Sequence, residues 1–104
     1  RAYFKLGLYE QALKSLDYAI KLENDEPEFY FSRAGAYLKQ ERYEDALYDY
    51  NQAIRLDSGF GDAYYNRGYC KYLISDKNGA CNDWRKADQM GIIEASSLKR
   101  KYCQ

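Results

Sequence analysis

One helical pattern occurs three times in this chain at a constant period. Between Tyr43 and Leu56, apolar or small residues fall at intervals of three and four, as one side of an α-helix requires. Related patterns lie 34 positions upstream and, in weakened form, 34 positions downstream, so that Ala12, Ala46 and Ala80 are equivalent. A constant period of this length indicates a repeat protein in which each unit contributes one helical hairpin.

Turn-forming residues divide the pattern into helices. We expect the end of a helix over residues 1–6, stopped by Gly7, and then helices over 9–22, 28–39, 43–56, 62–74, 78–90 and 94–102. The connections at 40–42 and 75–77 are short, so the helices on either side of each should run antiparallel. The sequence therefore predicts an all-α stack of antiparallel hairpins.

A chain of 104 residues forms at most one domain. We divide it into a truncated first repeat (1–26), a second repeat (27–60), a third repeat (61–91) and a capping helix (92–104). Because the first residues read as the middle of a repeat, we expect the native chain to begin upstream of Arg1. The sequence leaves the compartment open, with the cytoplasm slightly favoured.

The charge balance limits the classes of partner. Sixteen basic and sixteen acidic side chains give a formal net charge of zero, so we expect neither nucleic acid nor an anionic membrane as a main partner. No apolar run approaches the roughly 20 residues that span a bilayer, which argues against membrane insertion.

Residues that commonly carry catalysis or bind metals are scarce. The chain has no histidine, which excludes Ser-His-Asp and Cys-His arrangements, and it has no phosphate-binding glycine motif. We therefore expect no enzyme activity, no metal site and no cofactor. The three cysteines, Cys70, Cys81 and Cys103, are most simply interpreted as small buried hydrophobic residues. The alternative is a Cys70–Cys81 bridge between the facing helices of one hairpin.

The second repeat carries a family pattern. Its pattern residues are Tyr30, Ala34, Tyr37, Tyr43, Ala46, Tyr50 and Ala53. In type and spacing they resemble the tetratricopeptide repeat, in which two helices, A and B, form each hairpin. The resemblance covers roughly residues 1–91 and implies a right-handed α–α superhelix. The chain departs from the family at Glu41 and Ser75, where glycine is usual between helices A and B. The C-terminal residues resemble the closing repeat and capping helix of some bacterial members.

The resemblance also implies a function. In this family the A helices line a concave groove that binds a peptide or helix of a partner protein. By position, the groove candidates are Phe4, Lys5, Phe31, Leu38, Lys39, Tyr65, Asn66, Tyr69 and Tyr72. Phe31 and Tyr65 are equally compatible with packing between neighbouring A helices. A clamp for a chaperone's C-terminal carboxylate is not expected, because acidic Asp62 at one of its positions would repel that group.

A structural scaffold is the alternative function. The first repeat lacks most of its A helix, so the stripe of Tyr9, Leu13 and Leu16 is expected to be partly uncovered and available for self-association.

A second pair of repeated residues predicts ion pairs. Arg33 and Arg67 lie 34 positions apart on helix A, and Asp49 and Asp83 have the same separation on helix B. We expect these residues to form structural ion pairs that brace the hairpins, with ligand-facing arginines as the alternative. The sequence leaves open whether Arg67 meets Asp83 or Asp49.

Overall fold

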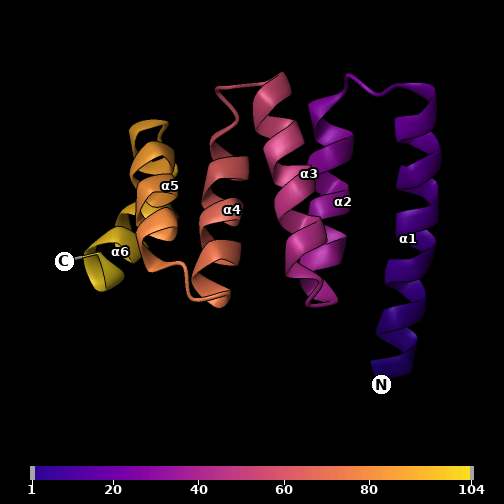
Figure 1. Ribbon diagram of the computed structural model, residues 1–104, viewed down its shortest axis with the longest axis horizontal. Helices are drawn as coiled ribbons and strands as arrows, with labels where there is room; N and C mark the ends of the chain where they lie inside the picture. The colour runs from indigo at the N-terminus through magenta and orange to yellow at the C-terminus, as the bar shows by residue number, and fades with distance from the viewer. Residues whose placement is uncertain (1, 104) are drawn as a thin grey trace.

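The computed structural model describes the backbone of residues 2–103 and the side chains of residues 7–103. This part of the chain forms six α-helices and no strands (Figure 1). The helices are α1 (Ala2–Leu22), α2 (Pro27–Lys39), α3 (Tyr43–Leu56), α4 (Gly61–Leu73), α5 (Lys77–Gln89) and α6 (Ile93–Tyr102). From α2 onward, each predicted boundary lies within one residue of the observed one. No described helix is both long and apolar enough to cross a membrane.

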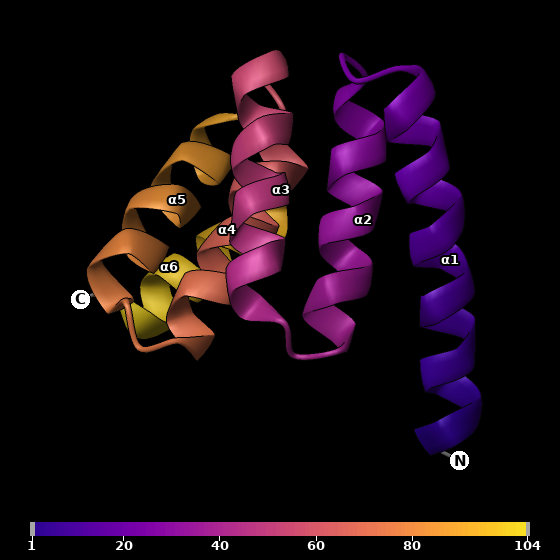
Figure 2. The same ribbon diagram turned by 45° about the vertical axis from the view of Figure 1, so that its right-hand side comes forward.

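The helices stack in chain order. Helices α2 and α3 form one antiparallel hairpin and α4 and α5 the next, while α1 packs against α2 and α6 packs against α5 (Figures 1 and 2). The stack of helices measures 40 × 33 × 20 Å. The predicted all-α superhelix of hairpins is thereby confirmed.

The expected helix break at Gly7 is wrong. Helix α1 runs through this position without interruption, and a Cβ atom placed on Gly7 would meet nothing within 4 Å. A glycine inside a helix costs only about 1 kcal/mol relative to alanine. No described residue packs against this position, so no tertiary contact stabilises a turn here. The helical hydrogen bonds therefore continue through Gly7.

The turns within the two hairpins share one geometry. Glu41 and Ser75, at the positions equivalent to Gly7, take positive φ angles of 62° and 72°. In each turn an amide donates back to the carbonyl five residues earlier, over 2.9 Å from Arg42 to Tyr37 and 2.8 Å from Asp76 to Lys71. This is the Schellman pattern, which satisfies carbonyls at the helix end. The fold thus requires a left-handed backbone conformation at both turns, although neither position is a glycine.

Small residues let the A and B helices of each hairpin cross closely. Ala46 and Ala80 are fully buried at this crossing, whereas the equivalent Ala12 is exposed, on a side of α1 that packs against no described helix. The second repeat pairs Ala34 with Tyr50, and the third replaces them with Gly68 and Trp84. A Cβ on Gly68 would lie 2.8 Å from the indole nitrogen of Trp84. The larger ring therefore requires the smaller partner.

The predicted ion pairs are present in both hairpins. Arg33 donates from Nε and Nη2 to the two carboxylate oxygens of Asp49, at 2.7 and 2.9 Å. Arg67 contacts Asp83 in the same way, at 2.8 Å for both bonds. Arg67 therefore pairs within its own repeat. These hydrogen bonds to Asp49 and Asp83 raise the pKa values of the two arginines, against the opposing effect of burial.

The third donor of each arginine reaches the preceding B helix. Nη1 of Arg33 donates to Asp17 over 2.9 Å, and Nη1 of Arg67 donates to Asn51 over 2.8 Å. Asp17 and Asn51 are themselves equivalent positions of successive repeats. Each arginine thus joins its own hairpin to the helix before it, which is a bracing role.

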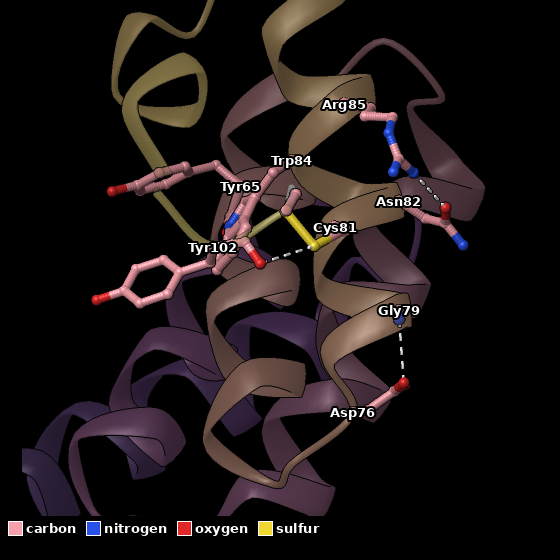
Figure 3. Close-up of a disulfide and its surroundings, with 9 residues drawn as sticks. Tyr65, Asp76, Gly79, Cys81, Asn82, Trp84, Arg85 and Tyr102 are labelled. Atoms are coloured by element: carbon pink, nitrogen blue, oxygen red, sulfur yellow. Dashed lines mark hydrogen bonds between the residues drawn. A yellow bond between two sulfur atoms is a disulfide. The ribbon is translucent and has the colours of Figure 1, made fainter. Parts of the chain in front are cut away.

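The cysteine prediction is wrong for two of the three residues. Cys81 of α5 and Cys103, directly after α6, form a disulfide with a Cα–Cα distance of 5.7 Å (Figure 3). Helix α6 returns along α5 and brings Cys103 beside Cys81. Cys70 is free and fully buried, and its thiol donates to the carbonyl of Tyr43 over 3.4 Å. The alternative Cys70–Cys81 bridge is therefore also wrong.

The stripe of α1 that was predicted to be partly uncovered is so at Tyr9 and Leu16 but not at Leu13. Leu13 is only 5% exposed and Tyr9 and Leu16 are half-buried, because this side of α1 packs against α2. The exposed apolar residues of α1 lie on another side of the helix.

Candidate functional site

A pocket of about 330 Å³ lies between the A helices α2 and α4. Its lining residues are Gly35, Leu38 and Lys39 of α2, Tyr50 of α3, and Tyr65, Asn66 and Tyr69 of α4. Five of the nine groove candidates, those at 38, 39, 65, 66 and 69, therefore meet around one cavity. Consecutive A helices lie next to each other in the stack, so they can share a cavity over the B helix between them.

The width of the pocket depends on one glycine. Gly35 and Tyr69 occupy the same position in successive repeats. A Cβ on Gly35 would meet nothing within 4 Å, so this wall of the pocket is open space. Tyr69 on the facing helix is 44% exposed. A tyrosine on α4 and a glycine on α2 together provide an aromatic surface with room beside it.

Two polar side chains of the pocket have no hydrogen-bond or ion-pair partner among the described residues. Within the described part of the chain, neither the Asn66 amide nor the Lys39 ammonium forms a hydrogen bond or an ion pair. Asparagine can both donate and accept, which suits a peptide backbone, and lysine can attract a carboxylate. Burial, together with the charge of Glu94 in α6, raises the pKa of the neighbouring Tyr65 and keeps its hydroxyl protonated.

Two groove candidates do not line this pocket and instead contact other aromatic rings. The ring of Phe31 lies 4.7 Å from that of Phe60 and 5.9 Å from that of Tyr50, measured between centroids. The ring of Tyr72 lies 4.8 Å from Tyr102 and 5.9 Å from Trp84. Phe60, in the loop before α4, lies against the first ring, and Tyr102 of α6 lies against the second, so neither residue lines this pocket; a role for them in binding stays a prediction. The side chains of Phe4 and Lys5 lie outside the described residues.

The sequence reasoning missed two lining residues. Gly35 was overlooked because the groove was assigned from large and polar side chains, whereas here the missing side chain creates the space. Tyr50 was considered only as a residue of the repeat pattern, yet it forms part of the pocket wall. Comparing the two repeats position by position, which aligns Gly35 with Tyr69, was the available signal.

The described residues contain no group of three or more His, Cys, Asp or Glu side chains that could hold a metal ion. The arrangement around the pocket provides contact surface and hydrogen bonding.

The helical hairpins, their constant period and the groove between A helices together define a helical-repeat protein. The sequence model described as "Tetratricopeptide repeat" matches residues 1–59, which is more than half of the chain. The chain therefore belongs to the tetratricopeptide repeat family, whose domains generally act in protein–protein interaction rather than catalysis. A search of curated proteins finds no match.

Solved structures of the same fold include peptide complexes. The first such domain of Spaghetti (RPAP3), bound to the HSP90 peptide SRMEEVD, has a TM-score of 0.89 and 26% identity over 99% of this chain and 83% of its own. The second domain of human RPAP3, in complex with the HSP70 peptide SGPTIEEVD, has a TM-score of 0.86 and 30% identity over 99% and 88%. The TPR2B domain of yeast Sti1, in a complex with pHsp70, shares the fold at 23% identity, over 99% and 89%, with a TM-score of 0.87.

Proposed function

We propose that this protein binds an extended peptide of a partner protein in the pocket between α2 and α4, and that it catalyses no reaction. The convergence of Leu38, Lys39, Tyr65, Asn66 and Tyr69 on one cavity carries the proposal. The aromatic rings offer contact area at a small entropic cost, and the Asn66 amide offers a donor and an acceptor to the peptide backbone. The pocket accepts an apolar side chain, and Lys39 favours an acidic residue next to it.

The chaperone peptides bound by similar proteins are useful probes. In this chain Asp62 is an exposed carboxylate in the first turn of α4, and it disfavours a terminal carboxylate nearby. We therefore expect the HSP90 peptide SRMEEVD to bind more weakly than an internal peptide with an apolar residue followed by an acidic one.

A peptide-display selection followed by fluorescence anisotropy tests the proposal. Tyr69→Ala and Asn66→Ala should each weaken the selected peptide by about tenfold, the cost of losing a well-placed contact. Tyr48→Ala is the matched control, because Tyr48 is a tyrosine 60% exposed on α3 and does not line the pocket. Equal binding by Tyr69→Ala and the parent, with circular dichroism showing that both are folded, would refute peptide binding in this pocket.

Self-association through α1 is the second candidate function. Leu8, Tyr18 and Leu22 are 51%, 65% and 65% exposed, and their spacing places them within roughly 80° of the helix circumference. An apolar stripe of this kind favours contact with another protein surface, including a second copy of the chain. Light scattering at increasing concentration tests this role. A parent that stays monomeric, or a Tyr18→Glu/Leu22→Glu variant that still dimerises, would remove it.

A further inference from the structure

A second cavity lies at the C-terminal end of the helix stack, between α5 and the end of α6. Its volume is about 520 Å³, and Lys77, Asn78, Asn82 and Arg85 of α5 line one side. Tyr102 and the Cys81–Cys103 disulfide form the other side (Figure 3). In Figure 3, Arg85 and Asn82 project from α5 on the side away from Tyr65, so this cavity is separate from the groove.

The cavity is basic. None of its lining residues is a carboxylate, and within the described part of the chain neither Lys77 nor Arg85 forms an ion pair. Among the described residues, the Arg85 guanidinium donates a hydrogen bond to the side-chain oxygen of Asn82, at 2.9 Å. An adjoining pocket of about 370 Å³ shares Arg85 and Cys103 and adds Lys99 and Arg100. Lys99 is paired with Asp88. The positive charge that a ligand of the first cavity would meet therefore comes from Lys77 and Arg85 of α5.

These residues are not part of the repeat pattern. The residues 34 positions before Lys77, Asn78, Asn82 and Arg85 are Tyr43, Glu44, Tyr48 and Asn51. None of those four is basic and one is acidic. The equivalent surface of the second repeat is therefore neutral to acidic, and the basic character appears only beside α6.

The geometry favours an extended chain over a single small anion. Lys77 and Arg85 are eight residues apart on one helix, which separates their Cα atoms by about 12 Å. Carboxylates four residues apart in an extended peptide span about 13 Å. Between the cations, Asn78 and Asn82 are separated by about 6 Å along the helix, close to the two-residue repeat of an extended backbone. Their amides can bond to peptide groups, while Tyr102 offers an apolar contact.

We propose that this disulfide-walled cavity is a second binding site, which takes an acidic peptide segment. Lys77 and Arg85 bind two of its carboxylates, and Asn78 and Asn82 bind its backbone between them. The disulfide holds the opposite wall in place, because it ties the end of α6 to α5. The site is independent of the groove between α2 and α4.

Fluorescence anisotropy with a labelled octapeptide of alternating glutamate and alanine tests this site. Arg85→Gln and Lys77→Gln should each weaken binding by about tenfold, as expected for loss of a charge-assisted contact. Arg55→Gln is the matched control, because Arg55 is also exposed on a B helix and hydrogen-bonds to an amide three residues earlier, Gln52. It should bind like the parent, as should Tyr69→Ala in the groove.

Several results would overturn the proposal. These are a parent that does not bind the acidic octapeptide, an Arg85→Gln variant that binds it like the parent, and an equal loss in Arg55→Gln, which would indicate non-specific attraction. Loss of binding in Tyr69→Ala would place the peptide in the groove instead. Displacement by inorganic phosphate at concentrations similar to those of the peptide would show a site for a single anion. An octapeptide of alternating lysine and alanine should not bind, and binding by it would exclude charge recognition.

Discussion

The Cys81–Cys103 disulfide should contribute a large share of the stability of this small domain. The bridge joins residues separated by 22 positions in the chain. Closing a loop of that length removes conformational entropy from the unfolded chain, which corresponds to about 3 kcal/mol at 25 °C. A domain of this size is typically stable by only about 5–15 kcal/mol. The Cys103→Ser variant, which changes a half-exposed residue, should therefore unfold much more easily than the parent.

Thermal and urea denaturation followed by circular dichroism measure this loss. A loss of about 3 kcal/mol should lower the melting temperature by roughly 12–24 °C, since 1 kcal/mol shifts the melting temperature of a domain of about this size by 4–8 °C. Reductant added to the parent should reproduce the variant, and it should not change the variant further. Cys70→Ala should keep the full response to reductant, because Cys70 is outside the bridge.

Two results would refute this reasoning. One is a Cys103→Ser protein within about 1 kcal/mol of the oxidised parent, because the loop-closure contribution would then be absent. The other is a parent whose stability is insensitive to reductant although thiol titration shows that the bridge has opened.

Three further predictions concern single side chains. Gly68→Ala should destabilise the protein by about 1–3 kcal/mol in urea denaturation, because the added methyl group overlaps the Trp84 ring, and an unchanged midpoint would contradict that packing. Ser75→Gly should stabilise it by about 0.5–1 kcal/mol, because the φ of 72° at this turn suits glycine, and a lower melting temperature would argue against the turn geometry. Burial raises the pKa of the Cys70 thiol from 9.0 to about 11, so the folded state holds this proton more tightly than the unfolded state. Stability should therefore fall as the pH rises above 9, by about 1 kcal/mol at pH 10, and Cys70→Ala should show a shallower fall.

The sequence singled out most of the residues that line the pocket between α2 and α4, but it did not distinguish them from equivalent residues that lie elsewhere. Phe31 and Tyr65 share a repeat position, and so do Leu38 and Tyr72. One member of each pair lines the pocket while the other lies against an aromatic ring from the segment after its hairpin. The difference comes from the segment after each hairpin, since Phe60 covers Phe31 and Tyr102 covers Tyr72. A repeat alignment assigns one role to each position, so it cannot distinguish these cases.

The sequence by itself determined the helices, the hairpins and the arginine braces. Most contacts in a stack of repeats join neighbouring units, and a constant period therefore describes both local structure and packing. The tertiary structure decided the outcome wherever no neighbouring repeat continues the pattern. Gly7 stays helical because no described residue packs against it to favour a turn, and Cys81 pairs with Cys103 because α6 folds back along α5. These outcomes depend on which surfaces meet in space, and residue spacing alone does not specify that.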